Sequence, residues 1–114
     1  DAVAAKYSVL INGFTEIAIT KLDILDNFDE LKICTHYEFN AEETSQMSKL
    51  ISNLEEVHPK YKSFIGWNKK TTGIDSFEKL PKEAQAYINY ISDYIGVPVK
   101  IISTGPGRNE IIFN

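Results

Sequence analysis

The feature that most constrains the fold is a helix that leads directly into an apolar strand late in the chain. From Pro81 to Ile95 the apolar residues recur at helical spacing, which predicts an amphipathic helix. Gly96 suits the end of this helix, and Pro98 prevents its continuation. The next segment, Val97 to Ile102, is almost entirely apolar, as is typical of a central strand in a parallel sheet. This helix–strand unit predicts an α/β domain.

A second apolar strand is expected from Phe14 to Lys21, and it also ends in polar residues. Lys21 and Asp23 share a face if the strand continues, or turn to opposite sides of a ligand if it bends there. The later strand ends in Ser103 to Gly107, where two glycines and a proline predict a tight turn with exposed backbone N–H groups. If the two strands are parallel neighbours, both turns lie at one edge of the sheet, where open α/β sheets bind ligands.

The rest of the chain predicts further helices, strands and loops. They are expected as helices from Asp1 to Gly13 and from Met47 to Val57, strands at Leu31–Phe39, Tyr61–Trp67 and Arg108–Phe113, and loops or turns at Asn40–Gln46 and Thr71–Gly73. Alternation in the strand that starts at Leu31 puts Cys34 and His36 on its polar face. Cys34 is nevertheless expected as a small buried hydrophobe, and His36 as an exposed side chain.

The composition excludes several classes of function. The 114 residues predict one domain, and a formal charge of −4 with a single arginine, Arg108, argues against a nucleic-acid partner. A single cysteine excludes an internal disulfide. No apolar run approaches the roughly 18 residues that a membrane span needs. A soluble, cytoplasmic protein with no membrane partner is therefore expected.

The two polar turns together suit the recognition of guanine. The carboxylate of Asp23 is able to accept two parallel hydrogen bonds, which guanine offers from N1 and its exocyclic N2. Adenine presents an acceptor at N1, which the carboxylate repels. Backbone N–H groups from Ser103 to Gly105 suit the guanine O6, and the aliphatic stem of Lys21 suits the face of the base while its ammonium group stays in water.

Four stretches of the chain match the motifs of one enzyme family in the same order. They are Thr20 to Asp26, Gly66-Trp67 with Thr71 to Ile74, Leu80-Pro81 with Ala84 and Tyr87, and Gly96 to Pro106. They resemble the C-terminal part of adenylosuccinate synthetase, the GTP-dependent enzyme of AMP biosynthesis, and Asn40 to Val57 is the stretch least like that family. By the matched motifs, the resemblance implies guanine contacts from Lys21, Leu22, Asp23, Ser103, Thr104 and Gly105, with Pro106 beside the base.

The resemblance also implies a larger parent enzyme, three-layered α/β and homodimeric, of which residues 1–114 form a single C-terminal piece that is α+β when isolated. The residues and the resemblance together predict that the strands ending at Asp23 and Ser103 are adjacent and parallel. The parent enzyme joins IMP and aspartate, using GTP and Mg²⁺, through 6-phosphoryl-IMP. Its phosphate loop, catalytic aspartate and histidine, and Mg²⁺ ligands belong to the N-terminal part. No catalytic or metal-binding residue is therefore expected in this chain, which we expect to be inactive alone, and His36 and His58 receive no role.

Two other interpretations stay open at this point. The chain is also compatible with a non-catalytic module that binds a nucleotide or another protein. Alternatively it is a purely structural α+β domain, in which Lys21 and Asp23 form a surface ion pair of little energetic consequence.

Overall fold

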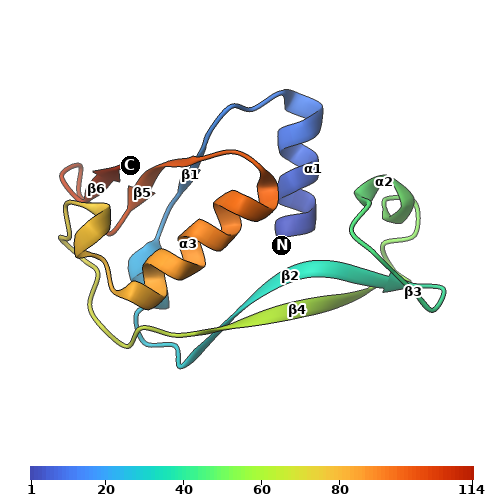
Figure 1. Cartoon of the computed structure of the whole chain (residues 1–114), viewed down its shortest axis with the longest axis horizontal. Helices are drawn as coiled ribbons and strands as arrows, with labels where there is room; N and C mark the ends of the chain where they lie inside the picture. The colour runs from blue at the N-terminus through green and yellow to red at the C-terminus, as the bar shows by residue number, and fades with distance from the viewer.

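The computed structural model describes residues 1–114 and arranges them in two three-stranded sheets with three α-helices (Figure 1). The strand orders are β1-β5-β6 and β3-β2-β4. The elements are α1 (Ala2–Asn12), β1 (Ile17–Ile19), η1 (Leu22–Leu25), β2 (Glu30–Phe39), β3 (Glu42–Thr44), α2 (Met47–Leu50), β4 (His58–Ile65), η2 (Phe77–Lys79), α3 (Lys82–Ile95), β5 (Val99–Ser103) and β6 (Ile111–Phe113). The α/β prediction is confirmed. None of the helices has both the length and the apolar character needed to cross a bilayer.

Strands β1 and β5 lie side by side and run parallel, with Ile17 opposite Val99 and Ile19 opposite Ile102. The predicted parallel pairing is therefore confirmed. Strand β6 pairs antiparallel on the other side of β5, so the sheet is mixed rather than wholly parallel. The prediction of a buried strand as far as Lys21 is wrong, because β1 stops at Ile19 and only half-buries its outer residues.

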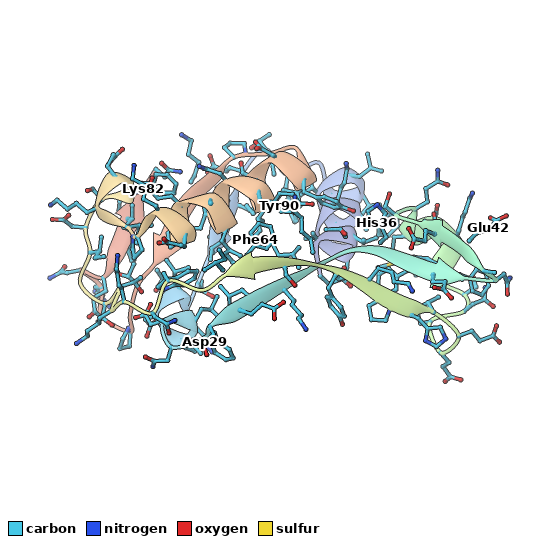
Figure 2. All side chains as sticks on the ribbon, turned by 60° about the horizontal axis from the view of Figure 1, so that its bottom comes forward. Asp29, His36, Glu42, Phe64, Lys82 and Tyr90 are labelled. Atoms are coloured by element: carbon cyan, nitrogen blue, oxygen red, sulfur yellow. The ribbon has the colours of Figure 1, made fainter.

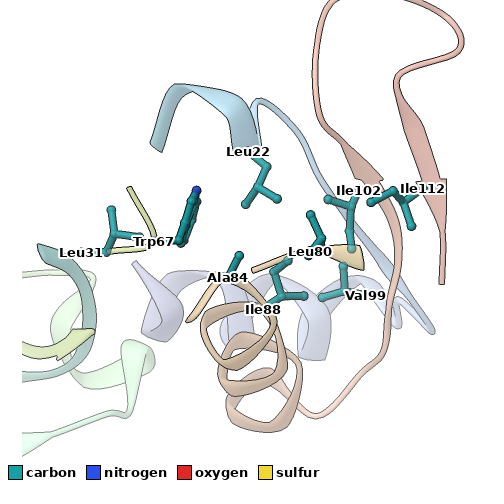
Figure 3. Close-up of a cluster of buried hydrophobic side chains, with 9 residues drawn as sticks. All are labelled: Leu22, Leu31, Trp67, Leu80, Ala84, Ile88, Val99, Ile102 and Ile112. Atoms are coloured by element: carbon teal, nitrogen blue, oxygen red, sulfur yellow. The ribbon is translucent and has the colours of Figure 1, made fainter. Parts of the chain in front are cut away.

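Helix α3 covers one face of this sheet and closes the main hydrophobic core. Pro81 is the residue before the first helical turn, and Gly96 ends the helix with a left-handed φ of 83° and an N–H bond to the Ser92 carbonyl. The core combines buried side chains of α3, the sheet and the loops around it (Figure 3). Its members are Leu22, Leu31, Trp67, Leu80, Ala84, Ile88, Val99, Ile102 and Ile112. Burying each leucine or isoleucine contributes about 1.5–3 kcal/mol.

The second sheet is dominated by a long antiparallel pair, β2 and β4, which packs against α3 near one end. The ring centroids of Phe64 on β4 and Tyr90 on α3 lie 4.9 Å apart. Both residues are labelled in Figure 2, where the strand passes the helix. The register of β2 shifts between Cys34 and His36. Strict alternation therefore fails there: Thr35 and Cys34 are both buried, whereas His36 is exposed. The predicted burial of Cys34 and exposure of His36 are confirmed.

Two predictions for the middle of the chain are wrong. The segment from Asn40 to Gln46 contains β3, because Asn40 (φ 52°) and Ala41 (φ 62°) form a two-residue left-handed turn that closes a hairpin with β2. The helix expected to reach Val57 stops at Leu50, which is the one fully buried residue of its apolar stripe. A single turn that buries one leucine gains too little to propagate the helix further.

Strand β4 begins at His58 rather than at Tyr61, and it includes Pro59. Because β4 is an edge strand, the missing N–H of a proline leaves no partner strand without a hydrogen bond. The last strand is also shorter than expected. It starts at Ile111 rather than Arg108, since the Glu110 N–H bonds to the Gly107 carbonyl and closes a turn.

The face of the β1-β5-β6 sheet opposite α3 carries an apolar row. Ala18 pairs with Ile101 and Ile101 with Phe113, and all three are exposed, Phe113 by 80%. The expected apolar stripe of α1 is buried only at its start, because Val3 is covered whereas Leu10 is 77% exposed. The chain therefore leaves apolar surface uncovered on this sheet and at the end of α1.

Gly66 permits a close approach between the end of β4 and the loop that precedes β2. A Cβ at this position would lie 1.6 Å from the carbonyl oxygen of Phe28. The Gly66 N–H also donates to the Asp29 carbonyl at 2.8 Å. Any side chain at position 66 therefore forces the backbone apart and moves Trp67, the next residue, away from the core.

We expect Gly66→Ala to lower the melting temperature more than Gly73→Ala. Gly73 has a φ of 81° with open space where a Cβ would point, so alanine there costs only the backbone term of about 1 kcal/mol. Alanine at Gly66 adds a steric collision with main chain. Thermal unfolding followed by circular dichroism compares the two variants, and equal losses would contradict the close approach.

Candidate functional site

The chain bends sharply at the carboxyl end of β1. Lys21 adopts the left-handed conformation (φ 61°, ψ 39°), which costs a residue with a side chain about 1 kcal/mol, and the turn η1 follows at once. Leu22 is fully buried and points toward Ile102 of β5 (Figure 3). Lys21 is exposed, while Asp23 is half-buried. Of the two geometries expected for Lys21 and Asp23, the structure shows the bent one.

The turn after β5 is held by its own hydrogen bonds. The Thr104 N–H donates to the Glu110 carbonyl at 2.9 Å, and the Ser103 hydroxyl donates to the Gly105 carbonyl at 2.9 Å. The Glu110 carboxylate accepts from the Gly107 N–H at 2.6 Å. For the Gly105 N–H, by contrast, no acceptor is found within the chain. The Gly105 N–H is therefore free to bind a ligand.

The structure brings the two predicted turns to the same end of the sheet. Since Ile19 lies opposite Ile102 in a parallel pair, the residues that follow each strand leave at the same edge. Lys21 to Asp23 follow β1 after one residue, and Ser103 to Pro106 follow Ile102 directly. Thr104 is buried and Pro106 is exposed.

A polar pocket of about 350 Å³ adjoins Asp23 on another side. Its lining residues are Asp23, Asp26, Asn27, Asn68, Lys69, Lys70 and Thr72. No residue of the turn after β5 takes part in this lining. Asp23 therefore lines a polar surface that it shares with the end of η1 and the loop after β4.

Asp26 is the polar residue of this region that sequence reasoning missed. Its carboxylate is only 6% exposed and accepts three hydrogen bonds of 2.8 Å, from the Trp67 Nε1–H, the Thr71 N–H and the Thr71 hydroxyl. Burying a carboxylate without such donors costs roughly several kcal/mol of desolvation free energy. The three hydrogen bonds therefore permit the burial of Asp26. No local pattern in the sequence marks this role, because Trp67 and Thr71 lie 41 and 45 residues further along the chain.

The aromatic side of this cluster continues into α3. The rings of Trp67 and Tyr87 lie 6.1 Å apart, and burial raises the pKa of Tyr87, because a phenolate would lose its hydration there. Tyr87 therefore stays neutral at physiological pH. The hydrogen bond from Trp67 to Asp26 and the packing of Trp67 on Tyr87 thus connect the end of η1 to α3.

The structure does not contain the surface ion pair considered for Lys21 and Asp23. Its ion pairs are Lys60–Glu38 and Lys79–Asp75. The Nδ1 of His36 forms a hydrogen bond with the Thr35 hydroxyl at 2.9 Å. No group of three or more His, Cys, Asp or Glu side chains is arranged to hold a metal ion.

We expect Glu110→Ala to loosen the turn after β5. Loss of the carboxylate removes the bond to the Gly107 N–H, and a charge-assisted bond worth about 1.5 kcal/mol corresponds to about tenfold in local opening. Glu110→Gln is the matched control, because its amide oxygen still accepts from that N–H. Hydrogen exchange at Gly107, read by NMR, should be faster in the alanine variant alone; equal rates in all three proteins would refute this role.

The chain is similar to known proteins over almost its whole length. A family model described as adenylosuccinate synthetase matches residues 1–112. The adenylosuccinate synthetases of Aquifex aeolicus and Schizosaccharomyces pombe are 47% and 41% identical, over 99% and 98% of this chain. Each alignment covers 26% of the relative, so the chain spans about a quarter of the length of these proteins. A solved structure of fully ligated adenylosuccinate synthetase from Plasmodium falciparum has a TM-score of 0.87 and 30% identity, over 100% of this chain and 28% of that one.

Proposed function

This chain belongs to the adenylosuccinate synthetase family, and we propose that it supplies the guanine-recognition part of a GTP-dependent ligase of purine biosynthesis. The parent reaction joins IMP and L-aspartate to give adenylosuccinate, GDP and phosphate. The observation that carries this proposal is the parallel register of β1 and β5, since it puts the turns after Ile19 and Ile102 at one edge of the sheet. Sheet edges of this kind are where α/β proteins bind nucleotides.

Asp23 is the residue that selects the base. Its carboxylate takes part in no ion pair and no side-chain hydrogen bond, so both oxygens are free to accept from guanine N1 and N2. Each such charge-assisted bond contributes roughly 1.5–3 kcal/mol. Adenine offers an acceptor at N1 in place of a donor, and that acceptor would leave the carboxylate unpaired and repelled.

The turn after β5 completes the recognition. The free Gly105 N–H donates to the guanine O6, while Ser103 and Thr104 hold the turn through the hydrogen bonds described above. Pro106 is exposed at the position beside the base. Lys21 lies across the base with its stem and keeps its ammonium group in water, and the buried Leu22 supports the bend beneath them.

The remaining parts of the reaction are assigned to polypeptide beyond these residues. The Mg²⁺ ligands of the parent enzyme are assigned to its N-terminal part. Binding of IMP, aspartate and the GTP phosphates is likewise placed outside this chain, in a cytoplasmic homodimer as the family likeness implies. We therefore expect residues 1–114 alone to show no ligase activity in a coupled assay for adenylosuccinate, and turnover by them would contradict the proposal.

We expect Asp23→Asn in the full-length protein to change the preferred base. Loss of the carboxylate should lower kcat/KM for GTP about 10- to 100-fold, as its hydrogen-bond energy implies. Xanthosine triphosphate has a carbonyl at C2, to which the new amide is able to donate, so its kcat/KM should rise relative to that for GTP. Steady-state kinetics with both nucleotides measure this ratio.

Asp93→Asn is the matched control, because Asp93 is an exposed carboxylate on α3 that takes part in neither ion pair. This variant should leave the ratio of the two nucleotides unchanged. An Asp23→Asn variant that lowers activity with both nucleotides equally would mean that Asp23 does not read the base.

A further inference from the structure

We infer that Asp26 and Thr71 are positioning residues, which hold the turn η1 so that Asp23 faces the guanine base. This inference rests on the proposed function. It is drawn from a different observation, the buried hydrogen bonds of Asp26. Asp26 and Thr71 act through Asp23 and do not contact the nucleotide themselves.

Only a short stretch of backbone separates Asp26 from Asp23. Both belong to the same turn, in which the Asp26 N–H bonds to the Asp23 carbonyl at 3.3 Å. Asp26 directly follows the last residue of η1. Any movement of the Asp26 side chain is therefore transmitted to the backbone that carries the Asp23 carboxylate.

The two residues that donate hydrogen bonds to Asp26 are themselves buried and held in place. Thr71 is fully buried and Trp67 is 3% exposed, so neither donor is able to follow a moving carboxylate. Thr71 donates twice, from its N–H to one carboxylate oxygen and from its hydroxyl to the other. A carboxylate that accepts hydrogen bonds at both oxygens is fixed in orientation as well as in position.

The backbone is strained at the other end of the same turn. Lys21 precedes η1 in a left-handed conformation, which a lysine keeps only where its surroundings impose it. Leu22, fully buried in the core, anchors the turn just after Lys21, and Asp26 anchors its far end. The base-reading residue Asp23 thus lies between two fixed points, and the Asp26 contacts supply one of them.

Thr71→Val in the full-length protein tests this inference. The variant removes the hydroxyl that donates to Asp26 and keeps the backbone donor and the side-chain volume. We expect the KM for GTP to rise about tenfold, whereas kcat at saturating GTP and the KM for IMP stay within about twofold. A purely structural residue would lower the fraction of folded enzyme, and hence kcat, without changing the KM for GTP.

Two further variants make the result specific. Thr71→Ser keeps the hydroxyl and should restore the KM for GTP to within about twofold of the wild-type value. Thr35→Val deletes another buried threonine hydroxyl, in the β3-β2-β4 sheet, and should lower stability with no change in that KM. If Thr71→Val proves unstable, Trp67→Phe removes the indole donor to Asp26 and is expected to raise the same KM.

The inference is overturned if Thr71→Val and Trp67→Phe leave the KM for GTP unchanged, or if Thr35→Val raises it equally. Asp23→Asn separates this failure from failure of the proposed function. A changed base preference in Asp23→Asn with an unchanged KM in Thr71→Val refutes only the positioning role. An unchanged base preference in Asp23→Asn refutes the guanine site and the positioning role with it.

Discussion

Parallel pairing of β1 with β5 is the constraint on which the rest of the site depends. The two strands are separated by about eighty residues of sequence, and their backbone hydrogen bonds put Ile19 opposite Ile102. A shift of that register would move the two turns relative to each other along the sheet edge. The pairing is fixed by burial, because Ile102 and Leu22 share the core that α3 covers.

Buried polar contacts then convert a sheet edge into a defined surface. Apolar packing holds η1 through the fully buried Leu22 and the partly buried Leu25. The carboxylate of Asp26 adds direction, because hydrogen bonds are strong only within a narrow range of angles. On the opposite turn, the Glu110 carboxylate has a comparable place beside Gly105 and Gly107. Two acidic side chains thus shape the backbone on which the proposed base contacts stand.

The features that depend on residues close together in the sequence could be predicted from it. Helix α3 and its end at Gly96 follow from periodicity and from the left-handed preference of glycine, and both are confirmed. Strand β3 was missed because its turn, Asn40-Ala41, lacks the glycine that usually marks such hairpins. The role of Asp26 was missed because its partners lie 41 and 45 residues away, beyond any local pattern. The individual guanine contacts stay a prediction, while the shared edge that they require is present.

A crystal structure of the full-length protein with bound GDP is the most direct measurement of the central claim. The geometry predicts that guanine N1 and N2 lie within hydrogen-bond distance of the Asp23 carboxylate, and O6 within that distance of the Gly105 N–H. Guanine bound at the same edge but turned away from Asp23, or bound elsewhere in the molecule, would contradict it.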